Sequence, residues 1–279
     1  MTAVLAWKGR VTGIAAAAII ALVAIPAGIA GPAAAAPPSS PSSSSTVAKY
    51  VALGDSVAAG QGAGGYIDAC LQSPNGYPTL LDAEPRTNLL RNPSCSGATI
   101  ADVAAGQLSQ LNRGTTLVTL TVGANEVDLT GILAACTPPS PDEACLAAIG
   151  AAQAYLASGQ LSIGIAGLVA AAATAAPGAE ILVTGYAIPF QPDLQPLTDQ
   201  VNALTGAMNS LIAAGVAGAA ASGIDVGYVD VTGLFLGHGV GSGASWLGEN
   251  PSDPITFLHP NAAGYSAYRD ALVAALAVP

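Results

Sequence analysis

The sequence predicts an α/β fold in which a mainly parallel sheet is covered by helices on both faces. Two observations carry this prediction. Short apolar or β-branched runs bounded by glycine or proline alternate with longer helix-like segments, and 52% of the residues are hydrophobic while 9% are charged. Such short runs are typical of buried strands, and their alternation with helices is typical of parallel sheets. The expected strands cover residues 50–54, 117–123, 181–186 and 226–231.

Helices are expected between and after these strands. Gly159, Gly164 and Gly167 interrupt the longest helix-like segment, which can therefore divide into two helices. In a parallel sheet of this type, functional side chains are expected just beyond the carboxyl ends of the strands. The expected helices cover residues 101–111, 143–176, 197–221 and 261–277.

The first 36 residues have the layout of a secretory signal peptide. Lys8 and Arg10 precede an uncharged apolar run over residues 11–30, and small residues follow it up to Ala36. This order is typical of signal peptides, so we expect a secreted protein. A permanent membrane anchor is the alternative, because the apolar run is just long enough to span a bilayer. Pro26 and the alanines near position 36 favour cleavage.

The chain beyond the signal peptide is acidic. Residues 37–46, PPSSPSSSST, form a Pro/Ser-rich linker with nothing to bury, and residues 47–279 make one domain of ordinary size. This part of the chain contains five basic and 17 acidic residues, which gives a net charge of −12. A nucleic-acid binder needs a cationic surface, so we expect no nucleic-acid partner. The five basic residues are Lys49, Arg86, Arg91, Arg113 and Arg269.

Four cysteines, Cys70, Cys95, Cys136 and Cys145, form an even set in a chain that we expect to be exported. Such a set predicts two disulfides. Three pairings are possible, and we favour the two that join neighbours along the chain because each closes a short segment rich in turn residues. Four free thiols are the alternative. Since no Cys-x-x-Cys or His-x-x-x-His spacing occurs, we expect no metal site.

A serine follows the first predicted strand. The segment YVALGDSVAAGQGAGGY places Ser56 at the turn where this strand meets the next helix or loop. A serine at this edge of the sheet lies where a helix N-terminus can offer backbone N–H groups to an oxyanion. Helix capping is the alternative for Ser56, and for Asp55 it is the favoured interpretation.

Three further segments carry candidate catalytic groups. His259 stands before Pro260 at the start of the last predicted helix, where an imidazole is well placed to act as a base on a nearby hydroxyl. Gly97 lies in a loop before a helix, and Asn125 lies just beyond a strand. Each offers a hydrogen-bond donor, one from the backbone and one from a side-chain amide, as a tetrahedral oxyanion requires. His238, in a glycine-rich loop, is interpreted as a surface residue.

In their order and spacing, the segments GDS, SG, GAN and HPN resemble the sequence blocks of the GDSL or SGNH hydrolases. The resemblance spans residues 49–279 and is greatest to secreted actinobacterial lipases and esterases. It implies a flavodoxin-like, three-layer α/β/α fold. It also implies that Ser56 is the nucleophile, that His259 is the general base, and that Ser56, Gly97 and Asn125 supply the oxyanion hole.

The chain departs from the family pattern at two positions. Glu126 follows Asn125 where the family usually has aspartate, which leaves the amide donor in place. Thr256 stands three residues before the histidine, where the family often has the aspartate that orients the imidazole. Either Asp253 reaches the imidazole or a backbone carbonyl such as that of Thr256 orients it. We favour the carbonyl, because it can fix the tautomer without a charge.

The sequence thus predicts a secreted serine ester hydrolase, a lipase or esterase, with a catalytic domain over residues 47–279 and no cofactor. We expect a monomer that acts on small-molecule or lipid esters, with transient contact to lipid surfaces. Trp246 and Leu247 are candidates for contact with an acyl chain. The alternatives are a non-catalytic exported module that binds glycans or cell-wall material, and the same catalytic groups acting on acetylated sugars or phospholipids.

Overall fold

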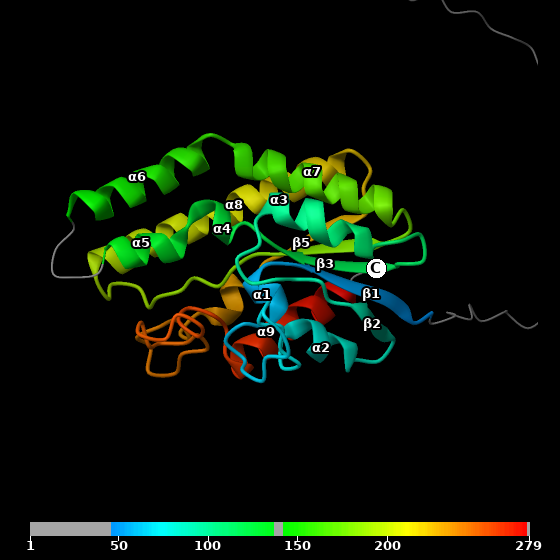
Figure 1. Ribbon diagram of the computed structural model, residues 1–279, viewed down its shortest axis with the longest axis horizontal. Coiled ribbons are helices and arrows are strands. Elements are labelled where there is room, and N and C mark those ends of the chain that lie inside the picture. The colour runs from blue at the N-terminus through cyan, green and yellow to red at the C-terminus, as the bar shows by residue number, and fades with distance from the viewer. Residues whose placement is uncertain (1–45, 137–141, 278–279) are drawn as a thin grey trace, which may run out of the picture. The chain divides into compact units, whose positions relative to one another are not determined.

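The computed structural model describes residues 46–136 and 142–277 (Figure 1). The predicted signal peptide and the linker up to residue 45 lie outside the described residues. A sheet of five parallel strands forms the centre of the domain, in the order β2-β1-β3-β4-β5. The strands are β1 (Ala48–Gly54), β2 (Thr87–Arg91), β3 (Leu117–Thr121), β4 (Glu180–Thr184) and β5 (Val226–Val229).

Helices cover both faces of the sheet. On one side lie α1 (Ser56–Ala59), α2 (Tyr77–Asp82) and α9 (Ala262–Leu276), and on the other lie α7 (Gln160–Ala175) and α8 (Pro196–Ala221) (Figure 1). This three-layer α/β/α arrangement with a parallel sheet confirms the predicted fold class. By length and hydropathy α8 could cross a bilayer, but its buried face packs in the core against α7 and β5.

The remaining helices are short or lie at the end of the sheet. As the glycines predict, the segment over 143–176 divides into two helices, α6 (Glu143–Ala157) and α7, and Gly159 between them has φ +72°. The other helical segments are α3 (Ile100–Asp102), η1 (Val103–Gln107), η2 (Leu108–Gln110), α4 (Ala124–Val127), α5 (Leu129–Ala135) and η3 (Thr232–Phe235).

Several elements differ from the sequence prediction, and the short helices α2, α4 and α5 were not expected. Strand β2 was not expected, because it is an edge strand whose side chains are largely exposed and whose sequence, TNLLR, lacks a long apolar run. The helix predicted over 101–111 consists of a short α-helix, a π-helical turn and a 3₁₀ turn. The buried amide of Gln107, at the end of the π-helical turn, hydrogen-bonds both the N–H and the C=O of Gly54 at 2.8 Å.

Two disulfides join the chain segments that the spacing favours. Cys70 is bonded to Cys95, and Cys136 is bonded to Cys145. The first disulfide lies beside the end of β1, because the N–H of Cys95 donates to the C=O of Gly54 at 3.1 Å. The N–H of Ser96 also donates to the C=O of Cys70 at 3.0 Å. The segment that carries Gly97 is therefore fixed both covalently and through backbone hydrogen bonds.

Candidate active site

Ser56 begins α1 directly beyond the carboxyl end of β1. Gly54, the last residue of β1, has φ +137°, and a Cβ there would lie 2.0 Å from the carbonyl oxygen of Thr121 in β3. Only glycine fits this close approach of the two strands. Asp55 caps α1, since its Oδ1 accepts the N–H of Val57 at 3.0 Å. This confirms the capping interpretation of Asp55 and leaves Ser56 at the first helical position.

The carboxyl of Asp55 is fully buried beneath the serine. Tyr186, just beyond β4, donates its hydroxyl to Oδ2 of Asp55 at 2.5 Å and accepts the N–H of Ala124 at 3.2 Å. Burial raises the pKa of Asp55 to about 7, and the bond from Tyr186 opposes this rise. Tyr186 therefore links the ends of β1, β3 and β4 directly below the site.

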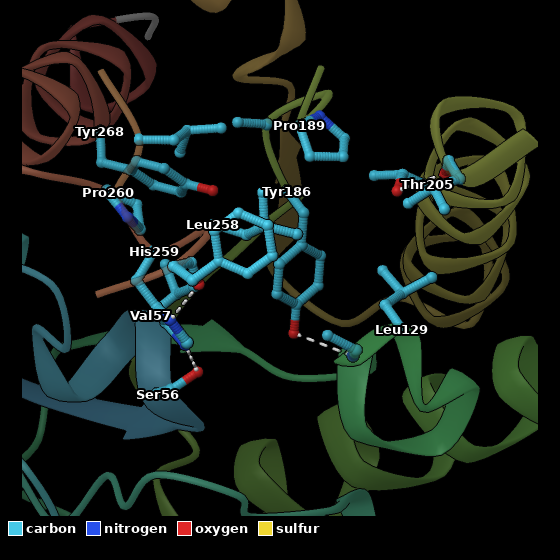
Figure 2. A pocket seen from close by; sticks show the side chains of 15 residues that line it. Ser56, Val57, Leu129, Tyr186, Pro189, Thr205, Leu258, His259, Pro260 and Tyr268 are labelled. Carbon is cyan, nitrogen blue, oxygen red and sulfur yellow. Dashed lines mark hydrogen bonds between the residues drawn. The ribbon is translucent and has the colours of Figure 1, made fainter. Parts of the chain in front are cut away.

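His259 lies beside Ser56, although 203 residues separate the two in the sequence (Figure 2). Nε2 of His259 is 2.9 Å from Oγ of Ser56, and Nδ1 is 3.0 Å from the carbonyl oxygen of Phe257. A carbonyl oxygen can only accept a hydrogen bond, so Nδ1 carries the proton and Nε2 is free to accept the serine proton. This is the tautomer that a general base requires.

The orienting group is a backbone carbonyl, as the sequence favours, but it belongs to Phe257. The carbonyl of Thr256 instead accepts the backbone N–H of His259 at 3.0 Å. The carboxylate of Asp253 accepts the hydroxyl of Thr256 at 2.7 Å and the N–H of Ile255 at 3.1 Å. Asp253 therefore stabilises the loop before the histidine without contacting the imidazole.

Burial also sets the protonation state of the imidazole. His259 borders the cleft but is otherwise enclosed, and this burial lowers its pKa to about 4, while the hydrogen bond to Phe257 opposes the shift. No charged group contributes to its pKa among the residues that the structure describes. The imidazole is consequently mainly neutral between about pH 4 and about pH 6.5, where a free histidine, with a pKa of about 6.5, would be mainly charged.

The three predicted oxyanion donors lie around one cleft. Ser56, Gly97, Asn125 and His259 all line it, and its volume is about 440 Å³. Nδ2 of Asn125 donates one proton to the carbonyl of Ala98 at 2.9 Å, which fixes the amide plane and leaves the second proton available. The backbone N–H groups of Ser56 and Gly97 have no acceptor among the described residues. An oxyanion entering the cleft would meet these donors.

Glu126, the first departure from the family pattern, connects α4, which carries Asn125, to the segment that follows Gly97. Its Oε1 accepts the backbone N–H of Ile100, three residues after Gly97, while Asn125 beside it bonds Ala98. Burial raises the pKa of Glu126 above its usual value, and its Oε2 is buried without a partner among the described residues. The longer side chain thus reaches the neighbouring loop and leaves the amide of Asn125 in position.

An apolar pocket opens beside the serine and the histidine (Figure 2). The hydroxyls of Thr205, Tyr186 and Tyr268 line it, but each donates its proton to another protein oxygen. The pocket, of about 90 Å³, is therefore suited to hydrocarbon. Of the two candidates for contact with an acyl chain, Leu247 lines the pocket, whereas Trp246 does not and stacks on His238 at a centroid distance of 3.7 Å. The other apolar lining residues include Val57, Leu129, Pro189, Val201 and Leu258.

Sequence reasoning missed three groups at the site: the carbonyl of Phe257, the hydroxyl of Tyr186 and the amide of Gln61. Tyr186 lies at the end of a predicted strand, so the rule that functional groups follow strand ends could have found it. Gln61 lines the cleft and is 5% exposed. Neither a backbone carbonyl nor a single glutamine has a sequence signature that indicates such a role.

The chain is similar to known proteins in sequence and in fold. Residues 52–267 match the model of the GDSL-like lipase/acylhydrolase family. Lipase 1 of Streptomyces coelicolor is 34% identical over 227 residues, which cover 78% of this chain and 82% of that protein. Among solved structures, phospholipase A1 from Streptomyces albidoflavus (30% identity) and the extracellular lipase from Streptomyces rimosus (32%) have TM-scores of 0.75 and 0.73. Each comparison covers 82% of this chain and 99% of the other.

The family match and the Streptomyces relatives agree with the fold and with the four ordered sequence blocks. The matched region runs from the end of β1 into the first part of α9, and so includes both Ser56 and His259. Proteins of this family are hydrolases of carboxylic esters. The chain belongs to the GDSL-like lipase/acylhydrolase family and is a carboxylic ester hydrolase.

Proposed function

We propose that Ser56 and His259 hydrolyse carboxylic esters through a covalent acyl-enzyme. The observation that carries this assignment is the hydrogen-bond chain from Ser56 Oγ to His259 Nε2 at 2.9 Å and from Nδ1 to the carbonyl of Phe257 at 3.0 Å. These two hydrogen bonds are directed so that the serine proton can move to the imidazole, and they lie beside the cleft that the oxyanion donors line.

The reaction takes two steps. Oγ of Ser56 bonds to the ester carbonyl carbon while its proton moves to Nε2 of His259, and the N–H groups of Ser56 and Gly97 and the amide of Asn125 hold the oxyanion. The carbon–oxygen bond to the alcohol then breaks, and the alkoxide takes the proton from the imidazole. Water attacks the acyl carbon, gives a proton to Nε2, and releases the acid as this proton returns to Ser56.

The substrate in this proposal is a lipid ester or small ester with an aliphatic acyl chain. The apolar pocket next to Ser56 supports this assignment, because its lining hydroxyls are already engaged and burial of each methylene there contributes about 0.8 kcal/mol. The three relatives are named lipases or a phospholipase. A panel of esters of increasing acyl length tests this part: kcat/KM should rise with length and then fall once the pocket is filled.

Export of the protein is the second part of the proposal. The signal-peptide layout of residues 1–36 and the likeness to the extracellular lipase of Streptomyces rimosus support it. All of the groups in the mechanism come from one chain, so a monomer suffices, and brief contact with a lipid surface would supply the substrate.

Substitution Ser56→Ala tests the catalytic assignment. It removes the hydroxyl that acts as the nucleophile. The variant should retain the fold, and its rate of hydrolysis of a short-chain nitrophenyl ester should fall by at least about 10⁴-fold. Wild-type hydrolysis by the alanine variant would refute the assignment. A wild-type protein that binds ester or glycan but turns over neither would favour the non-catalytic module.

A further inference from the structure

Gln61 is a buried polar side chain that contacts two loops of the site. It follows α1, is 5% exposed, and lines the same cleft as Ser56 and His259. Its backbone carbonyl accepts the hydroxyl of Tyr265 in α9 at 2.6 Å, which fixes the backbone at this position. The side-chain amide, in turn, lies between two loops.

The oxygen and the nitrogen of the Gln61 amide form hydrogen bonds to two different loops. Oε1 accepts the hydroxyl of Ser96 at 2.5 Å, and Nε2 donates to the carbonyl of Ile255 at 2.9 Å. Ser96 directly precedes Gly97, and Ile255 lies in the loop that leads to His259. An amide oxygen can only accept and an amide nitrogen can only donate, so this one side chain is complementary to both loops.

The same amide nitrogen lies beside the imidazole. Nε2 of Gln61 is 3.4 Å from Nδ1 of His259, whose proton is directed at the carbonyl of Phe257. Because the amide is uncharged and presents N–H here, it offers no acceptor that would attract the imidazole proton away from this carbonyl. Among the described titratable groups around the site, Asp253 bonds Thr256 and Ile255, Asp55 bonds Tyr186 and Val57, and Tyr265 bonds the backbone carbonyl of Gln61.

We propose that Gln61 is a positioning residue. It sets the distance between the loop that carries Ser96 and Gly97 and the loop that runs from Ile255 to His259, and it keeps His259 in its catalytic tautomer. The inference rests on the proposed function of Ser56 and His259. Displacement of reacting groups by about 1 Å can cost about 10²-fold in rate, and loss of one oxyanion donor costs about 10²- to 10³-fold. Through one amide, Gln61 fixes both the position of the imidazole and the position of the loop that supplies the Gly97 donor.

The primary test is Gln61→Leu, which keeps the approximate size of the side chain and removes both hydrogen bonds. It should lower kcat by about 10- to 100-fold and leave KM within about threefold. Gln72→Leu is the matched control: its Nε2 donates to the carbonyl of Ser94 at 3.1 Å, and it does not line the cleft. Its kcat should stay within about twofold of wild type.

Substitution Gln61→Glu tests the positioning role if the leucine variant does not fold. It keeps the shape and replaces the amide nitrogen by an oxygen next to Nδ1, so the acid limb of the kcat/KM profile should move up by about one pH unit or more. A side chain at position 61 that does not contact the imidazole in the folded protein would leave this limb unmoved. A double-mutant cycle adds a second readout: Ser96→Ala removes the same bond, so its effect on kcat and that of Gln61→Leu should not add.

The outcomes separate the two proposals. If Ser56→Ala is inactive but folded Gln61→Leu retains wild-type kcat, the positioning role is wrong and the catalytic assignment stands. A rise in KM alone, or an acid limb that Gln61→Glu leaves unchanged together with wild-type kcat, would equally overturn it. If Ser56→Ala is active, the proposed function itself fails.

Discussion

The acid limb of the pH–rate profile should lie near pH 4, well below the range of an ordinary histidine. Burial lowers the pKa of His259 to about 4, and the proposed mechanism needs a neutral imidazole. At pH 5, about 90% of a base with this pKa is neutral, against about 3% of a histidine with a pKa of about 6.5. The structure therefore predicts about 30-fold more activity at that pH than an unperturbed histidine would allow.

The assay is kcat/KM for ethyl butyrate from about pH 3.5 to about pH 8, with the released butyrate measured by chromatography. This ester carries no ionisable group, so the profile reports groups of the free enzyme. Circular dichroism at each pH checks that the fold persists, since loss of structure would also lower the rate. A limb with an apparent pKa of about 6.5 or higher in the folded protein would refute the reasoning.

Three substitutions test other contacts of the site. Asp253→Ala should leave kcat for a soluble ester within about threefold of wild type, because this carboxylate contacts the loop and not the imidazole. A loss of about 10³-fold in kcat with normal folding would make Asp253 the orienting group. Asn125→Ala should lower kcat by about 10²- to 10³-fold with little change in KM, and an unchanged kcat would remove Asn125 from the oxyanion hole. Tyr186→Phe should lower the free energy of unfolding in urea by about 1–3 kcal/mol, because the buried carboxyl of Asp55 loses a hydrogen-bond donor. A variant as stable as the wild type would contradict this prediction.

The central strands could be predicted from the sequence because they are buried on both faces. β1, β3 and β4 consist mostly of apolar and β-branched residues, which is the pattern typical of such strands. β2 has the same backbone pairing but lies at the edge of the sheet, where exposed polar side chains are allowed. Its sequence therefore carries no comparable signal.

The juxtaposition of the two proposed catalytic side chains was predictable from the sequence. Ser56 and His259 each stand in a sequence block at an element boundary, and the structure brings their side chains to 2.9 Å. The orienting carbonyl of Phe257 could not be assigned, because every residue has a carbonyl and only the loop geometry selects one. Gln61 was missed for a related reason: its partners lie 35 and 194 positions away along the chain.

Covalent labelling tests the central claim most directly. A fluorophosphonate should react with the wild-type protein at one position, and mass spectrometry of its peptides should locate the adduct on Ser56. His259→Ala should slow this reaction by at least about 10²-fold, because the serine hydroxyl then lacks its base. An adduct on another residue, or wild-type labelling of Ser56 without the imidazole, would contradict the claim that these two groups act as one nucleophile.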